Sequence, residues 1–310
     1  MTIVAGYDGR REGRDALALA AALAPILGED VVVASVYPSP ETSFRSTAQE
    51  LVASGKRTAA EGVGELPEGV DASPVAVPGR SAAEGLYQLL EAEHPSMVIV
   101  GSSHRGPLGH VLAGRVASRL LTASPCPVAV ALRGFATRDR PVLREIGVGF
   151  DDTPESWNAV QRAAAIGIVV GARLRIIHAL QPVAAPPMAP EESERLTREL
   201  RVQREHALAR AAASVSKELH TETTMLVGDP VRVLEREAGE GLDLLVLGSR
   251  GYGPERRVLL GGVSDSVVRR SPCPVLVVPR SVEFDPSAGG MAAHDTAAPA
   301  PREAHRAAAG

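Results

Sequence analysis

Short apolar runs recur at regular intervals along the chain, and a turn and a segment of helical character follow most of them. The first half holds such runs at residues 2–6, 31–37, 75–77, 97–100 and 127–132, and the second half at 146–150, 174–180, 223–227, 244–247 and 275–278. Continuous β-branched runs such as Val31–Tyr37 are typical of strands that are covered on both faces of a parallel sheet. Strands that alternate with helices predict an α/β fold with a doubly wound parallel sheet of five strands in each half.

The helices between these strands carry recognisable start and stop signals. The alanine-rich segment from Arg10 to Leu27 meets Pro25 and then Gly28, which predicts that its helix ends or kinks there. Thr153 before Pro154 is a capping residue followed by a proline at the first helical position. We also expect a mostly polar helix near residues 42–62 and a long charged helix over residues 191–219.

The chain is an internal duplication. At one offset of 147 residues, Gly101 aligns with Gly248, Gly106 with Gly253, Gly114 with Gly261 and Cys126 with Cys273. The pattern of Ile3–Asp8 also restarts at Ile146–Asp151. We therefore expect one domain at residues 1–133, a linker at 134–141 and a second domain at 142–280. Residues 281–310 are rich in Ala, Pro and Gly without apolar periodicity, which predicts a disordered tail.

Composition excludes several functions. A net charge of −4 with only 3% aromatic residues gives neither a basic stripe nor rings for base stacking, which argues against nucleic-acid binding. No apolar stretch is long enough to span a membrane. The N-terminus reads as a first strand and not as a signal peptide, so we expect a cytoplasmic protein. The two cysteines occupy equivalent repeat positions, which favours small buried apolar residues over a disulfide or a metal pair.

Common catalytic motifs are missing from the sequence. It contains no Walker-type phosphate loop, HExxH, CxxC or GxSxG, so zinc hydrolysis, dithiol redox chemistry and an esterase serine lack support. What remains is a glycine-rich turn that leaves a buried strand and enters a helix, at 248–267 and again at 101–120. Free backbone N–H groups in such a turn can face an anion, which suggests phosphate.

The second glycine segment resembles the nucleotide-binding signature of the universal stress protein family. Gly248 and Gly251 are followed after nine residues by Gly261, then by a helix and a Cys-Pro-Val-Leu-Val-Val strand. The strand that ends in Asp151, and His178 in the second strand, are also similar to that family. The resemblance covers residues 1 to about 280 as two tandem domains, and it implies a fold like that of the adenine-nucleotide α-hydrolases.

The resemblance implies a site for ATP, with or without Mg²⁺, between the loop after strand one, the end of strand two and the glycine loop. Asp151 and Asp8 would face the ribose or a metal-bound water, and Ala179 and Val36 would line adenine through their backbones. The candidate contacts are Gly149, Asp151, Ala179, Gly248, Arg250, Gly251, Gly253, Gly261, Gly262, Val263 and Ser264 in the second copy, and Gly6, Asp8, Val36, Gly101, Gly106, Gly114 and Arg115 in the first copy.

Both copies depart from the family pattern. Gly262 stands where the family has Ser or Thr, so a hydroxyl contact is missing unless Ser264 supplies it. In the first copy, His104 replaces the second glycine, and Arg115 either clamps a phosphate or fills its site. We assign no catalytic residue and no protein-bound metal site.

Purely structural interpretations stay open for the same residues. The glycines also suit a tight turn and close packing of helix on strand, and Asp8 and Asp151 also suit turn formation or helix capping. Arg250 also suits a solvated loop. His178 also suits a core position with its hydrogen bonds satisfied.

Three functions are compatible with the sequence. The resemblance favours an ATP-binding stress-response protein that acts as a nucleotide-dependent regulator or scaffold. A slow ATPase and a nucleotide-free interaction module are the alternatives. Family members pair through strand five, so we expect residues 128–132 and 275–279 to meet within the chain as a pseudo-dimer, and the protein to form a homodimer.

Overall fold

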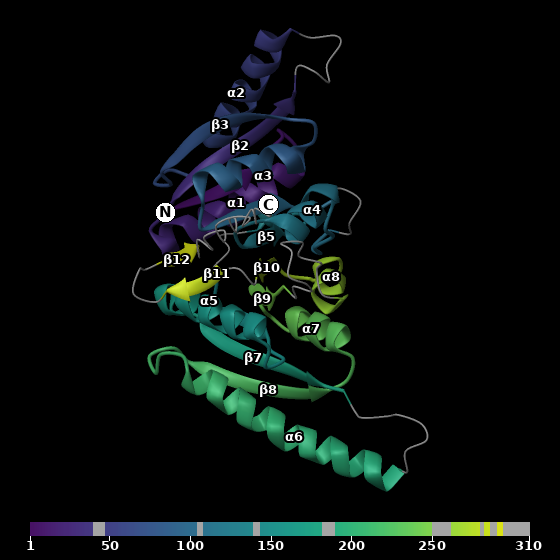
Figure 1. Cartoon of the computed structure of the whole chain (residues 1–310). Helices are drawn as coiled ribbons and strands as arrows, with labels where there is room; N and C mark the ends of the chain where they lie inside the picture. Colours follow the sequence, from purple (N-terminus) through teal and green to yellow (C-terminus); the bar gives the residue numbers. More distant parts are fainter. Residues whose placement is uncertain are drawn as a thin grey trace, which may run out of the picture.

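The computed structural model describes residues 1–39, 47–103, 108–138, 143–181, 190–249, 262–279, 282–285 and 290–293. Two α/β domains follow each other along the chain (Figure 1). The first contains β1 (Thr2–Gly6), α1 (Arg11–Leu27), β2 (Asp30–Pro38), α2 (Ala48–Gly64), β3 (Ala72–Gly79), α3 (Ala82–Glu93), β4 (Met97–Gly101), α4 (Arg115–Ala123) and β5 (Val128–Ala131). The second contains β6 (Glu145–Gly149), α5 (Pro154–Val170), β7 (Arg173–Leu180), α6 (Pro190–Ala213), β8 (Thr221–Val227), α7 (Pro230–Gly239), β9 (Leu244–Gly248), α8 (Gly262–Val268) and β10 (Val275–Val278).

The two domains share one ten-stranded sheet. Its order is β3-β2-β1-β4-β5-β10-β9-β6-β7-β8, and every pair is parallel except β5 with β10, which is antiparallel. Val130 lies opposite Val275 and Val128 opposite Val277 at this central junction. Figure 1 shows β5 and β10 in the middle of the molecule, with α2 at one end and α6 at the other. The predicted doubly wound fold and the pseudo-dimer of fifth strands are both confirmed.

The strand sequences explain why the sheet is buried. All four residues of β5 and all four of β10 are buried, and their aliphatic side chains belong to one hydrophobic core that runs through both domains. Helices cover the sheet, so the β-branched runs need no polar face. The junction between the domains is therefore built like the interior of a single domain.

Helix ends follow the sequence signals with one difference. Thr153 caps α5 and Thr47 caps α2, and each side chain accepts a hydrogen bond from the backbone N–H three residues on. In α1, Gly28 ends the helix in the left-handed conformation at φ 63°, as expected. Pro25 does not end it, because the helix continues to Leu27. Pro25 lies in the last turn of α1, where only two helical residues remain after it.

A buried carboxylate of the first domain binds the backbone at the start of the linker. Residues Phe135–Thr137 form a 3₁₀ turn, η2, directly after β5. Asp15 accepts hydrogen bonds from Gly134 N at 2.8 Å and Ala136 N at 2.9 Å. Burial raises the pKa of Asp15, and these backbone donors oppose that rise. The start of the linker is thus fastened to α1.

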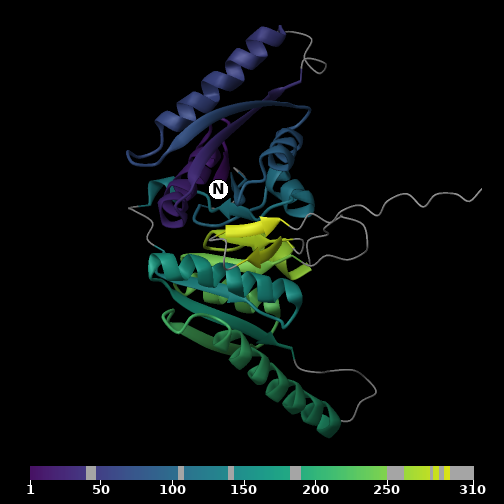
Figure 2. The same cartoon turned by 60° about the vertical axis from the view of Figure 1, so that its left-hand side comes forward.

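The tail contains two strands that the composition did not predict. Within residues 281–310, β11 (Val282–Asp285) pairs antiparallel with β12 (Gly290–Ala293). Figure 2 shows this yellow pair beside the teal helix α5. The expectation of a tail without regular structure differs from the structure over these eight residues, and the remainder of the tail lies outside the described residues.

Candidate nucleotide site

A cavity of about 480 Å³ opens at the carboxyl ends of β6, β7 and β9 in the second domain. This is where strand order reverses, since β7 lies on one side of β6 and β9 on the other. Ligands of open α/β sheets bind at this position, and pockets of about 300–1,000 Å³ suit small molecules. The described lining residues are Gly149, Phe150, Asp151, Thr153, Glu155, Ser156, Ile177, His178, Ala179, Asp229, Pro230, Val231, Leu234, Leu247, Gly248, Gly262, Val263 and Ser264.

The structure brings the second copy's candidates together. Gly149, Asp151, Ala179, Gly248, Gly262, Val263 and Ser264 all line this one cavity, although they come from three segments of the sequence. The other four candidates, Arg250, Gly251, Gly253 and Gly261, lie outside the described residues.

The strand-end glycines are needed for packing. A Cβ on Gly248 would lie 2.6 Å from the backbone of Glu155, at the start of α5. A Cβ on Gly149 would lie 2.7 Å from Leu247. The absence of a side chain at Gly248 lets α5 approach the sheet, and its absence at Gly149 leaves room for Leu247 and Leu234. Both positions therefore have a structural role beside their place in the cavity wall.

Asp151 is held in a turn of its own loop. Its Oδ1 accepts hydrogen bonds from Thr153 Oγ1 at 2.5 Å and Thr153 N at 3.3 Å. The carboxylate is partly exposed and faces the cavity region from the loop after β6. Turn formation and ligand contact are therefore compatible at this residue, because a carboxylate has lone pairs to spare.

Asp152 ties the loop to α6 and to α5. Its backbone has φ 66°, in the left-handed region that non-glycine residues rarely occupy. Trp157 Nε1 donates to Asp152 Oδ1 at 3.1 Å, and Arg210 lies 3.3 Å from the same oxygen. Arg204 NH1 donates to the Asp151 carbonyl oxygen at 3.2 Å. Sequence reasoning missed this cluster because α6 is far away in the chain and was predicted only as a long charged helix.

His178 is a core histidine that borders the cavity. It is 6% exposed, and its Nδ1 lies 2.8 Å from the Phe150 carbonyl oxygen. Burial lowers the pKa of His178, and the proximity of Arg204 lowers it further, against the opposite effect of the bond to Phe150. The neutral ring therefore donates from Nδ1 and keeps an acceptor at Nε2.

The first turn of α8 supplies the opposite wall. Ser264 Oγ donates to the Gly248 carbonyl oxygen at 2.9 Å, so its only hydroxyl hydrogen is already used within the protein. Gly262 is exposed, and a Cβ there would meet no atom of the described residues within 4 Å. The suggestion that Ser264 replaces the missing hydroxyl donor thus requires that the bond to Gly248 be broken.

In the first domain, the described candidates lie on β1, β2 and β4, in the loop after β1 and at the start of α4. Gly6, Val36, Gly101 and Gly114 are half-buried, whereas Asp8 and Arg115 are exposed, and Gly106 lies outside the described residues. Asp8 accepts a hydrogen bond from Arg10 N at 3.1 Å within its own turn. Gly101 again permits close packing, because a Cβ there would lie 1.9 Å from the Glu12 carbonyl oxygen.

The loop that leads into α7 was not among the sequence candidates. Asp229, Pro230, Val231 and Leu234 line the cavity, and Asp229 caps α7 by accepting from Arg232 N at 3.1 Å. The signal was available in the sequence, since Gly228-Asp229-Pro230 follows strand β8 at the same edge of the sheet.

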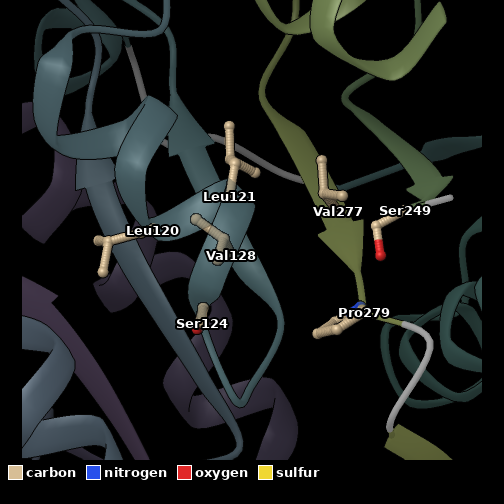
Figure 3. Close-up of a pocket in the computed structure, with 7 residues that line it drawn as sticks. All are labelled: Leu120, Leu121, Ser124, Val128, Ser249, Val277 and Pro279. Atoms are coloured by element: carbon tan, nitrogen blue, oxygen red, sulfur yellow. The ribbon is translucent and has the colours of Figure 1, made fainter. Parts of the chain in front are cut away.

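A second cavity, of about 10 Å³, lies between the domains. Figure 3 shows Leu121 and Val128 of the first domain across from Val277 and Ser249 of the second. The Ser249 hydroxyl is buried and has no hydrogen-bond partner in the part of the chain that the structure describes. This cavity has room for at most about one water molecule, so it is not a ligand site.

The cysteines behave as the sequence suggested. Cys126 and Cys273 are free and buried, and burial raises their pKa values to about 11 and about 12. Among the described residues, no group of three or more His, Cys, Asp or Glu side chains is placed to hold a metal ion. Nor is any described helix both long enough and apolar enough to cross a bilayer.

Comparison with known families decides the classification. The sequence model of the universal stress protein family matches residues 1–131 and 143–279. The chain belongs to the universal stress protein family. A universal stress protein of Mycobacterium tuberculosis is 29% identical over 303 residues, which covers 90% of this chain and all of the relative. A universal stress protein of Thermus aquaticus is 34% identical over 139 residues, covering 44% of this chain and 99% of its own length.

Solved structures agree on the tandem arrangement. A universal stress protein from Archaeoglobus fulgidus superposes with a TM-score of 0.64 at 21% identity, covering 90% of this chain and 98% of its own. A smaller universal stress protein, solved in complex with cAMP, is 31% identical over 45% of this chain and 99% of its own, with a TM-score of 0.35.

Proposed function

We propose that the second domain binds an adenine nucleotide, ATP with or without Mg²⁺, and that the protein serves in the cytoplasm as a nucleotide-dependent regulator or scaffold of a stress response. The observation that carries this proposal is the cavity of about 480 Å³ at the reversal of strand order. Three separately predicted segments line it: the end of β6 with the loop after it, the end of β7, and the end of β9 with the start of α8.

The chemistry of the wall suits a nucleotide. Ile177, Val231 and Leu234 give an apolar surface for a base, and the backbone at Ala179 supplies hydrogen-bonding groups beside it. Asp151 offers carboxylate oxygens to ribose hydroxyls or to a hydrated cation. Exposed backbone near Gly262, where no Cβ intervenes, lets phosphate oxygens approach N–H groups.

The same wall gives little support for rapid hydrolysis. The Asp151 carboxylate already accepts from Thr153, and the Ser264 hydroxyl already donates to Gly248. Efficient phosphoryl transfer needs a positioned group that orients the attacking water, usually with cations around the leaving phosphate. We propose binding as the main activity, and slow ATP hydrolysis is the second candidate.

The family resemblance also allows a nucleotide-free interaction module. Because β5 and β10 already pair within this chain, a homodimer would need another surface. Sedimentation equilibrium of the full chain distinguishes a monomer that contains a pseudo-dimer from the homodimer we propose.

One experiment separates the three functions. The full-length protein is purified without added nucleotide, denatured, and the released small molecules are identified by mass spectrometry. In parallel, phosphate release from ATP is followed with Mg²⁺ under multiple-turnover conditions. We expect an adenine nucleotide and far less than one turnover per minute. Rapid turnover would show that the protein is an enzyme. If no nucleotide is released and ATP does not bind at micromolar protein, the nucleotide-free interaction module is the function that remains.

A further inference from the structure

The first domain holds the far end of α8 by backbone hydrogen bonds. Val111 N donates to the Ser271 carbonyl oxygen at 2.6 Å, and Ala113 N donates to the Val268 carbonyl oxygen at 3.3 Å. Val268 ends α8 and Ser271 follows it in the second domain, whereas Val111 and Ala113 precede Gly114 in the first domain's glycine segment. These bonds therefore join the two repeats at a place other than the β5–β10 junction.

The donor segment is itself fastened to the first domain. Leu112 N donates to Ser102 Oγ at 2.7 Å, and Ser103 N donates to the Leu112 carbonyl oxygen at 2.8 Å. Gly109 N donates to the Arg133 carbonyl oxygen at 2.9 Å. The Val111 side chain is fully buried. The segment is thus a fixed support for α8.

The N-terminal end of α8 forms part of the cavity wall. Gly262, Val263 and Ser264 line the cavity, and Val268 is only four residues beyond Ser264. A helix of seven residues is marginal by itself, so contacts at its two ends decide how often it opens. Groups at one end of α8 are therefore coupled to groups at the other through the stability of the helix.

We propose that Val111 and Ala113 are positioning residues for the cavity of the second domain, acting through α8. The proposal rests on the proposed nucleotide site. A ligand that contacts the first turn of α8 stabilises the closed helix, which in turn protects the amide hydrogens of Val111 and Ala113 from solvent. By linkage, loosening these two donors weakens ligand binding in proportion to the fraction of molecules in which α8 is then open.

Amide hydrogen exchange of the full chain tests this coupling. Exchange is measured by NMR at single residues, with and without ATP, after calorimetry has given the dissociation constant. At ATP about ten times above that constant, opening of α8 is suppressed about tenfold, so the Val111 amide should exchange about tenfold more slowly. Gly109 is the internal control, because its amide bonds within the first domain. Equal slowing of Gly109 and Val111 would indicate general stabilisation and overturn the proposal.

A ligand-free measurement keeps the test independent of the nucleotide. Gly262→Ala adds a methyl group that meets no described residue within 4 Å. It raises helix propensity at the start of α8 by at most about 1 kcal/mol, the difference for a helix interior, which corresponds to about fivefold. We expect the Val111 amide to exchange up to about fivefold more slowly in this variant, with Gly109 unchanged. Gly64→Ala, at the end of α2 and equally unobstructed, is the matched control and should leave Val111 unaffected.

The outcomes distinguish the two proposals. If calorimetry finds no ATP binding but Gly262→Ala slows Val111 exchange, the nucleotide site fails and the coupling through α8 stands. If Val111 exchange is unchanged in Gly262→Ala, or unchanged by ATP that demonstrably binds, the positioning role is wrong.

Discussion

His178 Nδ1 lies 2.8 Å from the carbonyl oxygen of Phe150, and this contact fixes the imidazole between the ends of β6 and β7. A carbonyl oxygen can only accept, so Nδ1 carries the hydrogen and Nε2 is the ring's remaining acceptor. The imidazole therefore joins the first two strands of the second domain at the edge where the cavity opens.

This arrangement predicts a pH-dependent stability. Burial lowers the pKa of His178 in the folded state, so below the ordinary value of about 6.5 the unfolded chain binds a proton more readily than the native one. Stability contributed by the neutral ring is present above pH 6.5 and is lost as the pH falls toward the lowered folded pKa, at up to about 1.4 kcal/mol per pH unit. Urea denaturation between pH 8 and pH 5 measures the slope.

Two variants isolate the contribution of His178. His178→Gln should flatten the slope below pH 6.5. His220→Gln, at an exposed histidine beside Glu222, is the comparison variant that also removes one imidazole. Equal slopes in wild type and His178→Gln would show that other groups cause the acid sensitivity.

Asp152 should tolerate glycine better than alanine. Alanine loses the bonds from Trp157 and Arg210 and also meets the left-handed backbone, for a combined cost of about 2–3 kcal/mol. Glycine loses the same bonds but accepts φ 66°, as its counterpart Gly9 accepts φ 77°, so its cost should be about 1 kcal/mol. Thermal unfolding of Asp152→Ala and Asp152→Gly gives the comparison, and an alanine variant at least as stable as the glycine variant would contradict it.

The strand-end glycines should resist even a methyl group. Gly248→Ala places Cβ 2.6 Å from the Glu155 backbone, and Gly101→Ala places it 1.9 Å from the Glu12 carbonyl oxygen. Backbone atoms cannot move aside by a rotamer change as a side chain can. We therefore expect each of these two variants to lose about 3 kcal/mol or more in the free energy of unfolding. Gly64→Ala meets nothing within 4 Å and should be neutral or slightly stabilising. Chemical denaturation gives the free energy of unfolding of each variant. Equal values for Gly248→Ala, Gly101→Ala and Gly64→Ala would contradict this packing role.

The thiols should be inert in the native protein. With pKa values of about 11 and about 12, Cys126 and Cys273 are thiolates in about one molecule per thousand or fewer at pH 8, and both are buried. Ellman's reagent should label neither thiol in buffer within an hour and both at once in concentrated urea. Rapid labelling of the native chain would show that one of these sites opens to solvent.

The sequence predicted the architecture well because the signals were local and repeated. Apolar runs identified the strands, and the matching pairs Gly101 with Gly248 and Cys126 with Cys273 revealed two copies. Parallel order and the reversal point follow from topology rules, so the cavity's place at Asp151 and Gly248 could be anticipated.

What the sequence did not reveal depends on contacts between distant segments. The bonds from Val111 and Ala113 to the end of α8, and those from Arg204 and Arg210 to the loop after β6, join residues from different elements. The two tail strands were not predicted because their sequence has no apolar periodicity.

Isothermal titration of ATP into wild type, Ala179→Trp and Val36→Trp tests the proposed site most directly. Ala179 lines the cavity at the end of β7, and Val36 is its counterpart on β2 of the first domain. Circular dichroism first establishes that both variants fold. We predict that wild type and Val36→Trp bind ATP with the same affinity, and that Ala179→Trp binds at least tenfold more weakly because the indole fills the cavity. Undiminished binding by Ala179→Trp, or no binding by wild type, would contradict a nucleotide site in the second domain.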